Sequence, residues 1–350
     1  FPTNRMPEGD ESRRNDRIGF THVHHFYSKR NLWMLATLWT KANKLVIWRQ
    51  EKFLFEQIIL GMSRLSRYVP NAYSQSNRFL SGTLYIGSQV AEVTPRYILN
   101  KKKIGNIKKA FDRINRSQVN IITTNSVTDI EMPNNSLDYI FTDLPFGNNL
   151  MYSELNYLWE AWHKIQTNNK SEAIINNTQN KGLNEYKELM TACFKEMYRI
   201  LKPNRWMTVV FHNSKASVWN AIQDAITRAG FVIAQVTVLD KKQGSFKQVT
   251  SAGAVKNDLV INAYKPKKDF EEHFLRRAGE GLERDFVAEH LDHLPVEINI
   301  ERTEQMLYSK MLAHYIQRGY EIRLNARQFY AMLRDNFKLI DGYWFNDEQV

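Results

Sequence analysis

Cysteine is almost absent from this chain, which contains only Cys193 among its 350 residues. One cysteine excludes an internal disulfide framework and a cysteine zinc ribbon built within the chain. No apolar run approaches the roughly 20 residues of a membrane span, and no secretory signal pattern opens the sequence. These absences predict a protein of the reducing cytoplasm that has no membrane partner.

Acidic residues are outnumbered, with 37 Asp and Glu against 48 Lys and Arg, so the formal net charge is +11. A basic balance of this size suits a phosphate-rich partner, although excess charge also serves solubility alone. The first residue is Phe1 and not a methionine, so we expect the chain to be a fragment. Its length and its 43% hydrophobic content suffice for one large or two modest domains.

Composition and periodicity divide the chain into four predicted parts. Residues 1–19 are polar and lack an apolar period, which predicts an extended arm. Residues 20–266 carry the strand and helix patterns of a main domain, and residues 267–302 form a charged connector. Residues 303–350 hold two helical stripes followed by Asp341-Gly342. That order predicts a winged-helix-like module, and a plain helical cap is equally compatible.

The main domain alternates apolar runs with helical periods. A hairpin or strand is predicted at Phe79–Ile86, and strands are predicted at Val119–Ile122, Tyr139–Asp143, Met207–Phe211, Phe231–Leu239 and Asp258–Ala263. Helices are predicted after the N-cap Ser28 and at Lys101–Lys109, Glu185–Ile200 and Val218–Ala229, and a mobile loop at Asn168–Asn180. From Tyr139 onward the order is strand, helix, strand, helix, strand, loop, strand. It predicts an α/β unit that ends in a hairpin-like pair of strands.

One strand end carries the strongest chemical signal. The apolar run from Tyr139 ends in Asp143-Leu144-Pro145-Phe146, and ligands of open α/β sheets sit at the carboxyl ends of strands. Asp143 is therefore a candidate site residue that faces a crevice. The structural alternative makes Asp143 a turn acid that caps the next helix and Phe146 a core aromatic.

This loop resembles the Asp-Pro-Pro-Tyr/Phe motif of amino-methyltransferases, which transfer a methyl group from S-adenosylmethionine to an exocyclic base amine. The run Asn148–Trp162 resembles the segment that follows the motif in adenine-specific DNA methylases of the long, zinc-ribbon-containing type. The resemblance implies that Asp143 and the Leu144 carbonyl accept the amine hydrogens and that Phe146 stacks on a flipped base. Leu144 replaces the family's first proline, and Pro145 still favours an extended Leu144.

The segment that ends at Arg30 resembles the Phe-Tyr/Thr-x-Arg-x-Leu stretch of the same methylases. This resemblance implies that Phe26, Ser28 and Arg30 lie near the methionine end of the cofactor, and Asp143 is also expected to contact the cofactor. The family's glycine-rich cofactor loop has no counterpart in this sequence. We therefore expect a class I methyltransferase-like α/β sheet that is incomplete at its N-terminus and binds the cofactor weakly alone. An N-terminal region or a partner subunit would then carry that loop.

Lysines cluster between the last two predicted strands. Lys241, Lys242, Ser245 and Lys247 alternate with small and polar residues and are predicted to contact the nucleic-acid backbone. An ordinary solvated hairpin is the alternative, and the basic Lys101–Lys109 helix is a second candidate surface.

The predicted function is methylation of adenine in DNA. Two alternatives stay open: a non-catalytic nucleic-acid-binding fragment or subunit, and an RNA base methyltransferase. His22, His24 and His25 also raise a metal-binding interpretation. No second ligand cluster accompanies them, so packed imidazoles are favoured and no metal site is predicted.

Overall fold

The computed structural model describes the whole chain except residues 45–47, 114–119, 214, 240–257, 268–281 and 319–322. The described residues form two compact units. The first unit contains Phe1–Thr124 and Asn148–Gly182, and the second contains Asn125–Gly147 and Leu183–Val350. The chain therefore leaves the second unit directly after the candidate catalytic loop and returns to it at Leu183.

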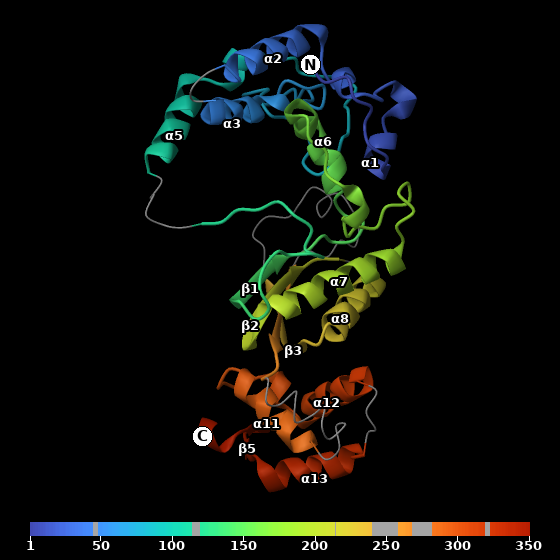
Figure 1. Cartoon of the computed structure of the whole chain (residues 1–350), viewed down its shortest axis with the longest axis vertical. Helices are drawn as coiled ribbons and strands as arrows, with labels where there is room; N and C mark the ends of the chain where they lie inside the picture. The colour runs from blue at the N-terminus through green and yellow to red at the C-terminus, as the bar shows by residue number, and fades with distance from the viewer. Residues whose placement is uncertain (45–47, 114–119, 214, 240–257, 268–281, 319–322) are drawn as a thin grey trace. The chain divides into compact units, whose positions relative to one another are not determined.

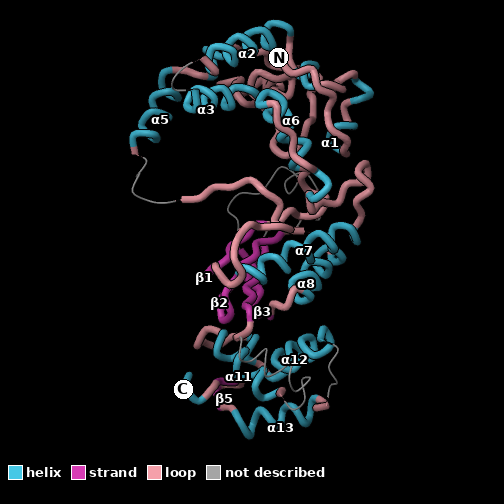
Figure 2. The backbone as a smooth tube through the Cα atoms, viewed as in Figure 1, coloured by secondary structure: helices cyan, strands magenta, loops and turns pink. Residues whose placement is uncertain are grey.

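Helices and loops make up the described part of the first unit (Figure 2). Its α-helices are α1 (Asp10–Arg13), α2 (Lys29–Ala42), α3 (Trp48–Ile59), α4 (Pro95–Ile98), α5 (Lys101–Asp112) and α6 (Tyr152–His163). Its 3-10 helices are η1 (Asp16–Ile18), η2 (Val23–Phe26) and η3 (Asn169–Ser171). The helix predicted after Ser28 is confirmed as α2, because the Ser28 hydroxyl accepts a hydrogen bond from the Asn31 amide.

Apolar stripes of three helices form the core of the first unit. Leu35 of α2, Ile59 of α3 and Leu158 of α6 are each completely buried and belong to one cluster. Aromatic side chains fill the spaces between the helices, and the ring centroids of Phe55 and Trp162 lie 5.3 Å apart. The buried face of each helix therefore follows the 3.6-residue period of its apolar side chains.

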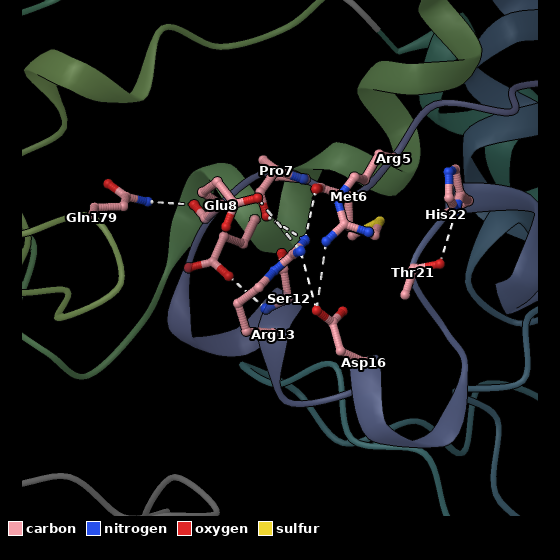
Figure 3. Close-up of polar contacts among 11 residues, drawn as sticks. Arg5, Met6, Pro7, Glu8, Ser12, Arg13, Asp16, Thr21, His22 and Gln179 are labelled. Atoms are coloured by element: carbon pink, nitrogen blue, oxygen red, sulfur yellow. Dashed lines mark hydrogen bonds and ion pairs between the residues drawn. The ribbon is translucent and has the colours of Figure 1, made fainter.

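The first nineteen residues are packed where the sequence predicts an extended arm. Figure 3 shows the Arg13 guanidinium donating to the Met6 and Pro7 carbonyls at 2.8 and 3.2 Å and pairing with Asp16. Met6 is only 1% exposed. Mainly polar contacts fix this segment. Because polar contacts produce no apolar period in the sequence, the sequence pattern did not indicate that the segment is packed.

Glycine is required at one position of this segment. A Cβ at Gly9 would lie 2.0 Å from the Glu154 carboxyl carbon, far inside van der Waals contact. Glu154 accepts hydrogen bonds from the Ser12 amide at 2.6 Å and from Asn176 at 2.9 Å. Asn176 is buried and lies within Asn168–Asn180, the stretch predicted as a mobile loop.

A four-stranded sheet forms the centre of the second unit. Its strands are β1 (Leu137–Asp143), β2 (Leu201–Phe211), β3 (Val232–Leu239) and β4 (Asp258–Lys265). They lie in the order β1-β2-β4-β3, with β1 parallel to β2 and β4 antiparallel to both of its neighbours. The predicted α/β unit with a final antiparallel strand is therefore confirmed.

The two faces of this sheet differ in burial. The crossover helices α7 (Leu183–Ile200) and α8 (Ala216–Arg228) pack against each other and against the strands (Figure 1). Met207 and Val209 are completely buried, whereas Tyr139 and Phe141 are 53% and 64% exposed on β1. Parallel strands are usually covered on both faces, whereas Tyr139 and Phe141 leave an exposed apolar area near the β1 edge among the residues that the structure describes.

Two predicted strands are wrong. Phe79–Ile86 is an irregular segment in the structure. Val119 lies outside the described residues, and the adjoining Ile121 and Ile122 are 86% and 93% exposed without strand pairing. Both stretches are apolar enough for a strand, but neither pairs with another strand among the described residues, and the Leu84 backbone bonds the side chains of Glu11 and Asn15 instead.

The C-terminal part of the second unit has helices followed by a hairpin. The elements are α11 (Glu283–His293), η4 (Ile300–Arg302), α12 (Glu304–Arg318), α13 (Ala326–Asn336), β5 (Lys338–Ile340), β6 (Tyr343–Phe345) and η5 (Asp347–Gln349). The two predicted helices are present as α12 and α13, and the Asp341-Gly342 turn joins β5 to β6. Helix α11, however, lies in the stretch predicted as a charged connector, and it packs against α12 and α13. Phe286 and Leu291 bury its apolar side.

Candidate functional site

The candidate catalytic loop begins where β1 ends, at the exposed Asp143. The next residue extends the parallel ladder, because the Leu144 amide donates to the Val210 carbonyl at 3.3 Å. The Leu144 side chain is 3% exposed and anchors the loop in the second unit. A buried anchor directly after an exposed acid fixes the direction of the Asp143 backbone.

Two side chains from other elements hold the loop carbonyls. The Tyr186 hydroxyl of α7 donates to the Pro145 carbonyl at 2.7 Å. The Asn213 amide, just beyond β2, donates to the Phe146 carbonyl at 3.0 Å. Asn213 also accepts from the Lys215 amide at 2.7 Å, so one side chain joins the loop to the start of α8.

The Leu144 carbonyl differs from the two carbonyls that follow it in its hydrogen bonding. Within the residues that the structure describes, it accepts no hydrogen bond, whereas the carbonyls of Pro145 and Phe146 each accept one. Gly147 then turns the chain with φ of 69°, a left-handed value that glycine adopts without steric cost. The loop thus leaves one acceptor for a ligand beside the Asp143 carboxylate.

Phe146 is half-buried and packs by its edge. Its ring centroid lies 5.8 Å from that of Phe211 and 5.9 Å from that of His212, with interplanar angles of 84° and 64°. His212 in turn faces the buried Asp258 at the start of β4, with 3.3 Å between Nδ1 and Oδ1. The ends of β2 and β4 therefore support the aromatic ring of the loop.

The predicted cofactor residues lie in the first unit, except Asp143. Phe26 is completely buried in the core of that unit. Ser28 and Arg30 converge on Glu92, with the Ser28 hydroxyl donating to Oε1 and the Arg30 guanidinium 2.8 Å from Oε2. The Ser28 hydrogen bond, followed by Arg30, lowers the pKa of Glu92 below its ordinary value.

A cavity of about 260 Å³ opens beside this carboxylate. Its walls include Ser28, Asn31, Ser63, Arg64 and Glu92. Asn31 is 1% exposed, and its Oδ1 atom has no hydrogen-bond partner among the described residues. The cavity combines an anion, a cation, hydroxyl groups and one unsatisfied acceptor.

The three histidines lie together in the first unit. The ring centroids of His24 and His25 are 4.3 Å apart, and that of His22 lies within 5.7 Å of both. Burial, and then the neighbouring imidazoles, lower the pKa of His24. In the parts of the chain that are described, no group of three or more His, Cys, Asp or Glu side chains has the arrangement of a metal site.

The predicted nucleic-acid contacts Lys241, Lys242, Ser245 and Lys247 lie outside the described residues. The site residues that sequence analysis missed are Glu92, Tyr186, Asn213 and the pair His212–Asp258. Of these residues, only His212 and Asn213 could have been noticed in the sequence, because Phe211-His212-Asn213 stands at the end of a predicted apolar strand. The other positions become visible only once the chain is folded.

The arrangement of the second unit defines a class of protein. Its antiparallel β4 lies between β2 and β3, and its polar loop follows the carboxyl end of β1. This is the α/β arrangement of class I methyltransferase-like proteins. Residues 137–345, more than half of the chain, match the sequence profile of the DNA methylase family of the N6/N4 type. The chain belongs to that family.

Several solved structures are similar to this chain. Two are of one Thermus thermophilus protein described as a DNA modification methylase, each 13% identical with a TM-score of 0.23. The first match covers 41% of this chain and 53% of that one, and the second, complexed with S-adenosyl-L-methionine, covers 47% and 66%. A Methanosarcina mazei S-adenosylmethionine-dependent methyltransferase is 11% identical over 49% of this chain and 80% of its own, with a TM-score of 0.26.

This chain thus spans about half the length of the first Thermus chain. TM-scores this low do not establish a shared arrangement, so the family assignment depends on the profile match. No curated protein sequence matches the chain significantly. Among the described helices, none combines the length and the apolar character that crossing a lipid bilayer requires.

Proposed function

We propose that this chain carries the amine-activating part of a DNA methyltransferase that transfers a methyl group from S-adenosylmethionine to the exocyclic amine of adenine. The observation that carries the proposal is the exposed Asp143 at the end of β1, followed directly by the Leu144 carbonyl, which accepts no hydrogen bond from a described residue. The membership of residues 137–345 in the DNA methylase family supports it.

Two acceptors side by side suit the chemistry of an aromatic amine. The lone pair of an exocyclic amine is delocalised into the base, which makes the nitrogen a poor nucleophile. Asp143 and the Leu144 carbonyl would each accept one N–H hydrogen. Their negative and partial negative charges would stabilise the positive charge that develops on nitrogen as the methyl group arrives. The Asp143 carboxylate would also be placed to accept the proton that the amine nitrogen loses after methyl transfer.

The hydrogen bonds from Tyr186 and Asn213 would serve positioning. They fix the Pro145 and Phe146 carbonyls and so determine where the preceding Leu144 carbonyl points. Phe146 would contact the target base by stacking after the base has left the duplex. Because its ring is held at the edge by Phe211 and His212, it would accept the base without first ordering itself.

S-adenosylmethionine, when bound, supplies an electrophilic methyl group on a positively charged sulfur. The cavity beside Glu92 fits the amino-acid end of this cofactor in donor type: Glu92 would accept from an ammonium group, and Arg64 would pair with a carboxylate. We assign Ser28 and Arg30 to holding Glu92 in place. Phe26 would act only through the packing of the core beneath them.

The DNA backbone remains the proposed partner of Lys241, Lys242, Ser245 and Lys247. Alanine at the three lysines should reduce the slope of log affinity against log salt by about 0.9 for each phosphate contact that is lost. An unchanged slope in the triple variant would remove these residues from the interface.

The product of methyl transfer tests the proposed function. The full-length natural protein is incubated with S-adenosylmethionine and duplex DNA, and the hydrolysed nucleosides are quantified by mass spectrometry. N6-methyladenine should form, and Asp143→Ala should abolish it while thermal unfolding shifts by only a few degrees. N4-methylcytosine as the product would overturn the choice of adenine. Turnover that persists in the Asp143 variant would overturn the assigned chemistry.

A further inference from the structure

The C-terminal elements follow the order of a winged helix-turn-helix. Helices α11, α12 and α13 pack around one core and are followed by the hairpin of β5 and β6, while η4 packs against both β6 and α12. Asp341 and Gly342 have φ of 50° and 86°, the left-handed pair that a tight two-residue hairpin turn requires. In this order α13 occupies the position of the DNA-reading helix.

Helix α13 has two contrasting faces. Phe329 and Leu333 are completely buried and fix it against α11 and α12. Arg327, Ala331 and Arg334 lie one turn apart on the opposite side, and all three are exposed. In Figure 1, α11 and α12 lie between α13 and the central sheet of β1–β4. The second face therefore points away from the core that holds the helix.

The two arginines on this face differ from others in the unit. Neither Arg327 nor Arg334 forms an ion pair or hydrogen bond with a residue that the structure describes. Arg302, by contrast, is completely buried and donates to the Trp344, Leu294 and Pro295 carbonyls. The guanidinium groups on α13 thus retain their donors for a partner.

We propose that α13 reads duplex DNA in the major groove, with Arg327 and Arg334 donating to guanine edges and Ala331 contacting a thymine methyl group. Paired N–H donors match the O6 and N7 acceptors of guanine, and a small apolar side chain matches the methyl group. Seven residues of helix extend about 10 Å, which corresponds to roughly three base-pair steps. The small Ala331 between the arginines allows the helix backbone to approach the bases closely.

This inference rests on the proposed function, since it names the part of the chain that would select the DNA sequence. The helix is well formed for that task. Asn325 and Gln328 form a capping box, in which each side chain accepts from the other residue's amide at 3.0 Å. An RNA duplex is a poor alternative, because its major groove is too deep and narrow for side chains to read.

Selection from a random duplex pool tests the proposal with the full-length natural protein. Wild type should enrich a sequence motif, and Arg327→Ala combined with Arg334→Ala should abolish that enrichment and weaken duplex binding at least tenfold. A variant with both Arg327→Lys and Arg334→Lys should bind duplex DNA non-specifically with a similar salt dependence. It should not enrich the sequence motif, because lysine cannot form the paired hydrogen bonds to guanine. Arg284→Ala removes an exposed arginine of α11 and is the matched control.

An alanine double variant that keeps the motif would overturn the proposal, and so would an RNA duplex that competes as well as DNA. Loss of motif in the Arg284 control would overturn it too, since the effect would then not belong to α13. Failure of the proposed function is separate. In that case wild type would show no amine methylation, while the dependence of the motif on Arg327 and Arg334 would remain.

Discussion

The two ends of the central sheet use similar polar residues in opposite ways. At the amino end of β2, Lys265 is 6% exposed. Its ammonium group donates to the Asn135 side-chain oxygen at 2.8 Å and to the Tyr198 and Leu201 carbonyls at 2.8 and 2.9 Å. Its three hydrogens thus have three acceptors. Nearby, Arg199 donates to the carbonyls of two residues that precede β1 and to its own helix neighbour Glu196.

At the carboxyl end, the same sheet presents Asp143 to solvent and leaves the Leu144 carbonyl without a hydrogen bond from any described residue. The comparison separates stability from chemistry. Polar groups that are fully bonded within the protein stabilise the fold, whereas a carbonyl such as that of Leu144, which no described residue bonds, retains its bonding capacity for a ligand. Substitutions at the carboxyl end should therefore reduce activity with little loss of stability, and substitutions at the amino end should reduce stability.

The largest expected effect is that of Asp143→Asn. Asparagine keeps the size of the side chain and one acceptor but removes the negative charge, so methyl transfer should fall roughly a hundred- to a thousandfold. The free energy of unfolding should stay within about 0.5 kcal/mol of wild type, as for a typical exposed position. Single-turnover kinetics and urea unfolding measure the two quantities. A large loss of unfolding free energy alongside the loss of methyl transfer would contradict the distinction between the two ends of the sheet.

The reverse pattern is expected for Lys265→Met. Methionine has a similar length but no donors, so it removes the hydrogen bond to the buried Leu201 carbonyl and the part-buried hydrogen bonds to the Tyr198 carbonyl and the Asn135 side-chain oxygen. The free energy of unfolding should fall by about 3 kcal/mol, because each buried unsatisfied group costs about 1–3 kcal/mol. Urea unfolding measures the loss. Lys202→Met, at an exposed ion pair with Asp138, is the matched control and should cost less than about 1 kcal/mol.

A smaller effect on activity is expected for Tyr186→Phe. Removing this hydroxyl frees the Pro145 carbonyl and loosens the loop, so methyl transfer should slow by roughly tenfold. Tyr139→Phe is the control, because it deletes a hydroxyl that bonds Thr208 at 2.7 Å in the middle of the sheet. Comparable slowing in both variants would show that the effect is general and not one of loop position.

The smallest expected effect concerns acid stability at the amino end. The hydrogen bond from Arg199, with that from the Ile130 amide, lowers the pKa of Glu196 to about 2. Since the folded pKa lies below the ordinary 4.5, the stabilisation is present above pH 4.5 and is lost as the pH falls from there toward 2. Glu196→Gln should flatten the melting temperature against pH in that window. An unchanged profile would indicate that the pair contributes nothing.

Much of the second unit could be predicted from the sequence. Strands β1 to β4 and helices α7 and α8 have apolar periods that match their burial, and Asp143 stands out because it follows such a run. These properties are local, because they depend only on residues that are close together in the sequence. Asn148–Trp162 resembles the segment that follows the catalytic motif in the methylase family. It nevertheless belongs to the first unit, which no local pattern indicated.

The sequence alone determined the catalytic candidate, because the acid, the proline and the aromatic of Asp143-Leu144-Pro145-Phe146 adjoin one another. Only the tertiary structure decided which carbonyl of that loop remains available, since Tyr186 and Asn213 reach it from positions 41 and 67 residues away. It likewise placed Glu92 against Ser28, 64 residues apart. Hydrogen bonds between distant residues have no periodicity in the chain, so the fold has to bring the partners together before either can be recognised.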